Sequence, residues 1–182
     1  MKDTDQQTLN TIDSENKKQD SQEVKQEFLR EIQYLIFESA ENLYGIDILK
    51  ITEILKPVVV TRLPNAENFV LGVINLRGNI VPVLDIKKIL KDEYTELTNF
   101  SRIIVCNIYN KNLGLLVEKV LEVVTLREDQ IEGGEVRNFS DNYIEGIGRS
   151  RDKLFLIFNL PLLVEQYKQK ENKKIKELKS LE

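Results

Sequence analysis

Residues 69–86 read FVLGVINLRGNIVPVLDI, and this stretch decides the fold. Two runs rich in apolar and β-branched residues, 72–76 and 80–84, flank Gly78-Asn79, a pair that supplies turn residues. The pattern therefore predicts a β-hairpin. Apolar residues then follow at positions 86, 89 and 90. That i, i+3, i+4 spacing predicts a short helix with one buried face directly after the hairpin.

Short runs of Ile, Val, Leu, Tyr and Phe recur along the rest of the chain about every ten residues, with turn residues between them. They predict further strands at 32–37, 43–48, 53–60, 102–109, 113–117, 120–126, 143–149 and 154–158. Short helices are expected at 65–70, after Pro64, and at 160–166, in addition to the one at 86–90. The predicted fold class is mainly β, arranged as barrels or a sandwich.

The chain also resembles itself. Moving 69 positions along it places Tyr34-Leu35-Ile36-Phe37 on Ile103-Ile104-Val105-Cys106. Moving 74 positions places Arg77 on Arg151, with apolar residues matched on the C-terminal side. Self-similarity at a fixed period indicates a repeated unit. Two halves of about 65 residues predict two similar small barrels that share an apolar seam, because one such unit alone would be marginally stable.

The two halves differ at two places that bear on function. Asn75-Leu76-Arg77-Gly78 in the first half corresponds to Arg149-Ser150-Arg151-Asp152 in the second. A hairpin needs turn residues there but does not need an arginine preceded by leucine, so Arg77 either decorates a solvated turn or has a functional role. Leu49 corresponds to Glu118 in the second half. An apolar residue in one copy and an acid in the other suggests that Leu49 faces either a partner protein or the seam between the barrels.

Charge and composition exclude several classes of function. The 26 Lys and Arg residues and 30 Asp and Glu residues give a formal net charge of −4, which disfavours binding to nucleic acid. The chain contains no histidine, which removes His-based acid–base catalysis, Ser-His-Asp and Cys-His sites, and His-ligated zinc. The lone Cys106 lies in an apolar run and is predicted to be an ordinary buried thiol. We expect no catalytic residue, no metal site and no cofactor.

The two ends of the chain differ in composition from its middle. Residues 1–27 are mostly charged and polar and predict a disordered tail, because they cannot bury enough apolar surface to fold. Residues 167–182 form a C-terminal tail in which Ile175, Leu178 and Leu181 are spaced for a short amphipathic helix, either docked on a partner or solvated. No apolar run reaches the roughly 20 residues needed to cross a bilayer, and the N-terminus lacks a signal-peptide segment. A soluble, cytoplasmic protein is expected.

Residues 69–86 resemble the central signature of the CheW-like domain, which occurs in chemotaxis coupling proteins and at the C-terminus of the chemotaxis kinase CheA. The resemblance extends through YGIDILKITEIL at 44–55, GLLVEKV at 114–120 and YIEGIG at 143–148, and covers about residues 28–166. It implies two five-stranded SH3-like barrels packed around a shared hydrophobic core. The first barrel half would span 28–95 and the second 96–166.

The resemblance also implies a non-enzymatic adaptor that couples methyl-accepting chemoreceptors to the histidine kinase CheA. Such a protein would be a cytoplasmic monomer that assembles into arrays with its partners, recruited to the inner face of the membrane through receptors without inserting into it. On the family pattern, receptor binding would fall on Ile51, Glu53, Gly72, Asn75 and Arg77. Kinase binding would use Leu35, Ile46 and Leu49. An adaptor of a non-flagellar chemosensory pathway, and a kinase-array scaffold that does not contact receptors, remain open as alternatives.

Overall fold

A computed structural model describes residues 30–133, 143–151 and 153–165 of the 182-residue chain. The tails predicted at 1–27 and 167–182 lie outside these residues. In chain order the elements are β1 (Glu31–Ser39), β2 (Asn42–Asp47), η1 (Ile48–Lys50), β3 (Ile51–Leu55), β4 (Val70–Leu76), β5 (Asn79–Asp85), α2 (Ile86–Lys91), β6 (Arg102–Ile108), β7 (Lys111–Val117), β8 (Lys119–Arg127), η2 (Glu128–Gln130), β9 (Ile131–Gly133), β10 (Ile144–Ser150), β11 (Lys153–Phe158) and a helix at 160–165. The prediction of a mainly β fold with short helices is confirmed.

Two predicted elements differ from the observed ones, both in the segment that precedes β4. The strand predicted at 53–60 ends at Leu55, two residues before Pro57, which has no backbone N–H to donate to a strand ladder. The helix predicted at 65–70 is absent. That segment forms turns, with Asn65 in the left-handed region at a φ of 58°, and Val70 already begins β4.

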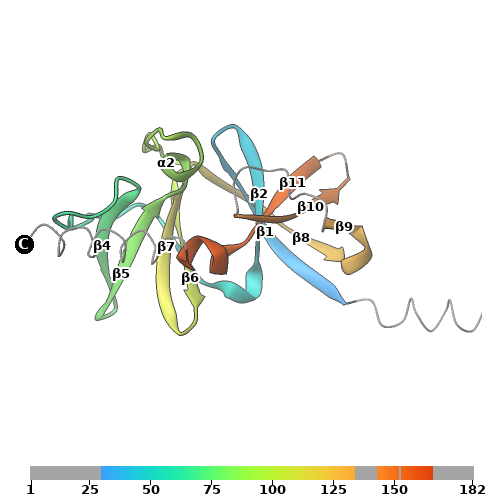
Figure 1. Ribbon diagram of the computed structural model, residues 1–182, viewed down its shortest axis with the longest axis horizontal. Coiled ribbons are helices and arrows are strands. Elements are labelled where there is room, and N and C mark those ends of the chain that lie inside the picture. Colours follow the sequence, from blue (N-terminus) through green and yellow to red (C-terminus); the bar gives the residue numbers. More distant parts are fainter. Residues whose placement is uncertain (1–29, 134–142, 152, 166–182) are drawn as a thin grey trace, which may run out of the picture.

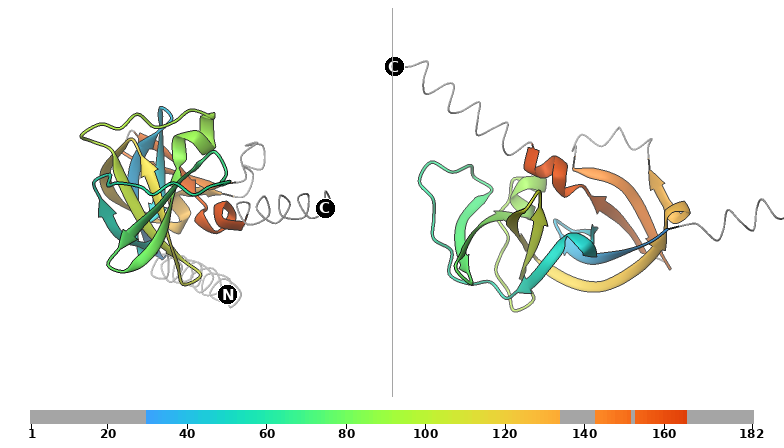
Figure 2. Two further views of the ribbon diagram at one scale, coloured as in Figure 1. Left: turned by 90° about the vertical axis from the view of Figure 1, so that its left-hand side faces the viewer. Right: turned by 90° about the horizontal axis from the view of Figure 1, so that it is seen from below.

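The strands form two sheets, each curled into an SH3-like barrel (Figure 1). The first barrel has the strand order β3-β6-β7-β5-β4, and the second has the order β8-β1-β2-β11-β10-β9. Figure 2 shows the two barrels side by side, with the helix at 160–165 at their junction. These orders correspond strand by strand under the sequence repeat, because β3, β6, β7, β5 and β4 match β8, β1, β2, β11 and β10.

Each barrel takes strands from both halves of the repeat. The hairpin β1–β2 belongs to the first half but pairs with β8 and β11 in the second barrel. The hairpin β6–β7 belongs to the second half but pairs with β3 and β5 in the first barrel. The prediction of one barrel per half, divided at residues 95 and 96, is therefore wrong. The two halves exchange their first hairpins, which a shift of the sequence against itself cannot reveal.

The turns of the two halves match each other as clearly as the strands do. Ala40-Glu41 closes β1–β2 and Tyr109-Asn110 closes β6–β7, and all four residues have φ between 50° and 65°. Arg77 and Arg151, which follow β4 and β10, both have a φ of 53°. Two-residue loops with positive φ match the right-handed twist of the strands that they join. Equivalent turns in both halves therefore share one backbone geometry, even where their residues differ, as Ala40-Glu41 and Tyr109-Asn110 do.

Three apolar clusters fill the described part of the chain: one inside each barrel and the largest between them. Strand β1 shows why the run at 34–37 is apolar at every position. Leu35 and Phe37 face the cluster between the barrels, whereas Tyr34 and Ile36 face the interior of the second barrel. Strand β6 repeats this arrangement. The predicted apolar seam is confirmed, and we refer to it below as the shared core.

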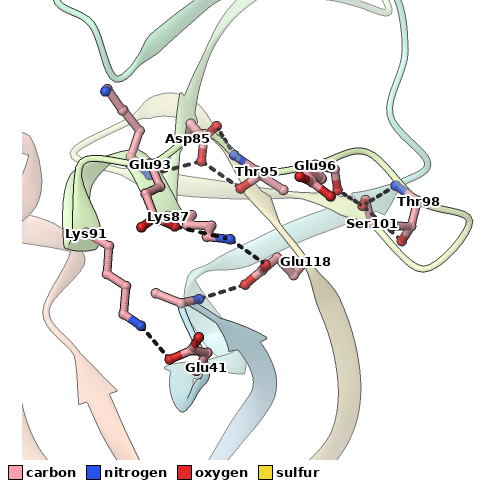
Figure 3. Close-up of polar contacts among 12 residues, drawn as sticks. Glu41, Asp85, Lys87, Lys91, Glu93, Thr95, Glu96, Thr98, Ser101 and Glu118 are labelled. Atoms are coloured by element: carbon pink, nitrogen blue, oxygen red, sulfur yellow. Dashed lines mark hydrogen bonds and ion pairs between the residues drawn. The ribbon is translucent and has the colours of Figure 1, made fainter.

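Polar contacts tie the two barrels together beside α2 (Figure 3). The Glu118 carboxylate, between β7 and β8, accepts a hydrogen bond from the Ala40 N–H at 2.7 Å and another from Lys87 Nζ at 3.3 Å. Lys91 Nζ lies 2.6 Å from Glu41 Oε2. These contacts hold α2 against the β1–β2 turn of the other barrel. Glu118, the counterpart of Leu49 in the repeat, therefore has a structural role.

Candidate protein-docking site

The turn between β4 and β5 presents the residue that the sequence singled out. It consists of Arg77 and Gly78, with φ of 53° and 88°, and the Gly78 N–H donates to Asn75 Oδ1 at 2.9 Å. The sequence placed the turn one residue later, whereas Asn79 pairs with Leu76 as the first residue of β5. Hairpin turns favour Asn or Gly where φ is positive. The backbone geometry of the turn therefore gives no reason for an arginine at this position.

Arg77 forms an ion pair across the first barrel. Its side chain is 79% exposed, and its Nη2 lies 3.0 Å from Glu53 Oε1. Glu53 belongs to β3 at one edge of the sheet, whereas Arg77 follows β4 at the opposite edge. The contact therefore bridges the two edges of the curled sheet. An exposed pair of this kind contributes at most about 1 kcal/mol, so both charges can exchange this contact for one with a partner at little cost.

Asn75 shares the exposed surface of this turn, together with a residue that sequence reasoning missed. Asn75 pairs across the hairpin with Ile80, and both residues are exposed. The signal for Ile80 lies in the alternation of β5, because neighbouring residues of a strand face opposite sides and Val81 is buried. Ile80 is therefore a large apolar side chain on the solvent face of the hairpin. We call Glu53, Asn75, Arg77 and Ile80 the hairpin surface.

Gly72 and Ile51, the other two predicted receptor contacts, lie farther inward. Gly72 is buried with a φ of 140°, and a Cβ on it would collide with the carbonyl oxygen of Thr61. Thr61 and Val73 exchange two backbone hydrogen bonds of 2.9 and 2.8 Å, so the glycine permits two chain segments to approach closely. Ile51 is partly buried against the shared core. Gly72 therefore shapes the first barrel, and Ile51 offers only part of its side chain to the surface.

The three predicted kinase contacts do not lie together. Leu49 is 79% exposed on η1, the crossover between the barrels, where its N–H donates to Asp47 Oδ1 at 2.9 Å. Leu35 and Ile46 are 5% and 0% exposed and belong to the shared core. Side chains buried this deeply in the shared core offer almost no surface to another protein, so the structure contradicts the kinase-binding prediction for Leu35 and Ile46. The exposure of Leu49 also excludes the alternative that it faces the seam.

Charged and polar side chains connect η1 with the last described helix. Partial burial raises the pKa of the Glu145 carboxyl. The positive charge of Lys50 lowers the pKa of this carboxyl, and the negative charge of Asp47 raises it. Glu145 Oε2 accepts a hydrogen bond from Asn159 Nδ2 at 2.9 Å. Asn159 Oδ1 in turn accepts the Leu162 N–H at 3.0 Å and so caps the helix at 160–165. The exposed Leu49 is thus flanked by charged residues.

The described residues include one buried thiol and no cluster of metal-ligating side chains. Burial raises the pKa of the Cys106 thiol to about 12, which leaves it protonated and unreactive at neutral pH. No three His, Cys, Asp or Glu side chains in the described ranges are grouped to hold a metal ion. Across the same ranges, none of the helices has the length and apolar character to span a membrane. The hairpin surface and Leu49 are candidates for docking other proteins because their charged and apolar side chains are exposed.

Comparison with known proteins decides the family. The model of the CheW-like domain matches residues 33–168. The chain belongs to the CheW-like domain family. It is 31% identical over 134 residues to the chemotaxis protein CheW of Klebsiella aerogenes, covering 72% of this chain and 81% of that protein. It is 31% identical over 148 residues to the chemotaxis protein CheW of Helicobacter pylori, covering 80% and 90%.

A solved structure of the CheW-like family agrees with the fold. The crystal structure of the scaffolding protein TtCheW from Thermoanaerobacter tengcongensis matches with a TM-score of 0.68 and 36% sequence identity, covering 72% of this chain and 90% of that one. The resemblance read from residues 69–86 and the pair of SH3-like barrels are thereby confirmed. The chain is one of the CheW-like scaffold and adaptor proteins of chemotaxis.

Proposed function

We propose that this chain is a non-enzymatic adaptor that couples methyl-accepting chemoreceptors to the histidine kinase CheA and supports their assembly into arrays. The observation that carries the proposal is the Arg77–Glu53 ion pair at the surface, whose arginine lies in the stretch 69–86 that resembles the central signature of the family. The names of the CheW relatives support the chemotactic role. The adaptor would act in the cytoplasm and reach the inner face of the membrane through the receptors.

We assign receptor binding to the hairpin surface together with Ile51. The cytoplasmic tip of a chemoreceptor is a helical hairpin, and helices dock through apolar side chains at regular spacing. Ile80 and the exposed part of Ile51 would receive such side chains. Arg77 and Glu53 would orient the helices by charge, which favours specificity and association rate more than affinity. Gly72 would act indirectly by keeping the first barrel in shape.

We assign kinase binding to Leu49, since Leu35 and Ile46 are core residues. The regulatory domain of CheA is itself CheW-like, so two related folds can meet end to end. Contacts between unlike surfaces close into rings when their rotation permits it. A receptor signal would then shift the kinase between states through contacts that differ between those states.

Charge reversal at the turn tests the receptor assignment. The variant Arg77→Glu places two acids against each other, and we expect it to abolish capture of a receptor cytoplasmic fragment while kinase binding stays within a few-fold. The matched control is Arg151→Glu, which changes the same residue type at the same φ of 53° in the second barrel. Control and wild type should capture the receptor equally. Equal loss of receptor and kinase binding in Arg77→Glu would show that the site is wrongly assigned.

A further inference from the structure

The segment between α2 and β6, residues 92–101, lacks regular secondary structure and is nevertheless held by fixed contacts (Figure 3). Its anchor is Asp85, which is 0% exposed. The Asp85 carboxylate accepts the Thr95 N–H at 2.9 Å and the Thr95 hydroxyl at 2.7 Å. Farther along, the Thr98 N–H donates to Ser101 Oγ at 2.9 Å. The backbone of the segment is therefore fixed by buried polar groups at several points.

This fixed segment holds large apolar side chains in solvent. Leu97 is 64% exposed, and Tyr94 and Phe100 are exposed to a similar degree. On the neighbouring segment after β3, Val58 is half exposed and Val59 is 94% exposed. Large apolar side chains held in solvent on neighbouring segments often mark a place where another molecule binds.

The fold itself does not require apolar residues at positions 58 and 59. The repeat of 69 positions places Val58 and Val59 on Arg127 and Glu128, which are charged and exposed. The second half therefore carries charges at the two positions that correspond in the sequence repeat, although β8 continues to Arg127 whereas β3 ends at Leu55. Exposed valines in the first barrel need a reason other than folding.

A cleft separates these two apolar segments, and its charge has one sign. Its volume is about 670 Å³, and its lining consists of Lys56, Pro57, Leu97, Thr98, Asn99 and Arg102. Among residues 30–133, 143–151 and 153–165, the Arg102 guanidinium donates only to the carbonyl oxygens of Asn99 and Ser101, at 2.9 and 2.7 Å. Lys56 has neither a hydrogen-bond nor an ion-pair partner among the residues that the structure describes. Two cations without a carboxylate thus line the cleft of a chain whose net charge is −4.

We infer that this cleft binds an acidic amphipathic segment of a partner protein, with its carboxylates on Lys56 and Arg102 and its apolar side chains on Leu97, Val58 and Val59. The site is distinct from the hairpin surface, because β5 begins at the Arg77 turn and ends where α2 starts, so the segment after α2 lies at the opposite end of the first barrel (Figure 1). The inference therefore goes beyond the proposed receptor and kinase contacts. It predicts a second docking surface on the same barrel.

Site-specific photo-crosslinking in the cells that make the protein tests the inference. The full chain carries p-benzoylphenylalanine in place of Leu97, and the adducts are identified by mass spectrometry after irradiation. We expect an adduct with another protein, through a peptide that combines Asp or Glu with apolar residues. The variant Lys56→Glu should reduce its yield at least tenfold, because the reversed charge repels the carboxylates. Lys111→Glu, on an exposed lysine at the β6–β7 turn, is the matched control and should leave the yield unchanged.

Several outcomes would overturn the inference. A crosslink yield at position 97 no higher than that of the same probe at Lys111 would remove the docking surface. A yield that Lys56→Glu leaves unchanged would remove the acidic partner. An adduct with residues 1–29 of this chain, or with a second copy of it, would replace the partner protein by a self-contact. Thermal unfolding of each variant, monitored by circular dichroism, verifies that a lost adduct does not reflect a lost fold.

Discussion

Paired alanine substitutions at Ile46 and Leu49 separate the shared core from the surface, although only two residues lie between them. Ile46 is 0% exposed, so Ile46→Ala removes apolar groups worth about 2.4 kcal/mol in transfer free energy, at about 0.8 kcal/mol for each CH2. The cavity left behind adds to this, and such substitutions cost about 2–5 kcal/mol in all. We expect Ile46→Ala to lower the free energy of unfolding by about 3 kcal/mol. Leu49→Ala should change it by less than about 0.5 kcal/mol.

Urea unfolding followed by circular dichroism measures both free energies, and thermal unfolding should show Ile46→Ala melting roughly 10 °C lower. Binding of the CheA regulatory domain, measured at a temperature where both variants are folded, should then follow the opposite order. Leu49→Ala should weaken kinase binding, and Ile46→Ala should leave it near the wild-type value. If Ile46→Ala weakened kinase binding while leaving stability intact, the placement of Ile46 in the shared core would be refuted.

Two further predictions concern the contact between the barrels and the lone thiol. Glu118→Gln should destabilise the protein by about 1 kcal/mol in urea unfolding, because the charge-assisted bonds to the Ala40 N–H and to Lys87 become neutral or are lost; Glu122→Gln, which affects only an exposed pair, should have no measurable effect. Cys106 has its pKa raised from 9.0 to about 12 in the folded state, so its protonated form is favoured and its stabilising contribution, complete below pH 9, is lost as pH rises toward 12. Stability profiles from pH 8 to 11 should therefore fall less steeply for Cys106→Ala than for wild type, and parallel profiles would contradict the assigned burial effect.

The strands could be predicted from the sequence because the two patterns that indicate them, the alternation of a strand and the i, i+3, i+4 spacing of a helix, are local. Alternation along β4 and β5, and the spacing of apolar residues after them, are set by neighbouring positions in the chain. The exchange of hairpins could not be predicted in this way, because each hairpin has two equivalent sets of strands with which it could pair. Strand β1 can satisfy its two apolar faces beside β8 or beside β3, since these strands are related by the repeat. Only the length and path of the crossovers at η1 and Glu118 decide between them, and no sequence periodicity reports that path.

The sequence predicted the receptor side of the candidate site better than the kinase side. Arg77 stood out because the turn did not require an arginine, whereas Asn75 and Glu53 were named from the family resemblance. The structure brings Arg77 and Glu53 to 3.0 Å. The kinase candidates failed where the residue type was ambiguous. An apolar side chain in a strand is equally suited to a core and to a docking surface, so Ile46 and the exposed Ile80 could not be told apart without the sheet's faces.

The hairpin exchange joins the two barrels into one mechanical unit, through which the proposed adaptor would relay a docking event from one barrel to the other. Each barrel includes two strands that the other half supplies, so neither can change its curvature without moving the crossovers at η1 and Glu118. One crossover carries the exposed Leu49, and the other is fixed by Glu118 to α2 and the β1–β2 turn. The two crossovers, which correspond in the repeat, therefore differ: η1 exposes Leu49 to solvent, whereas Glu118 fastens the barrels together. The proposed adaptor role would use this asymmetry, because one crossover would meet a partner while the other keeps the two barrels together.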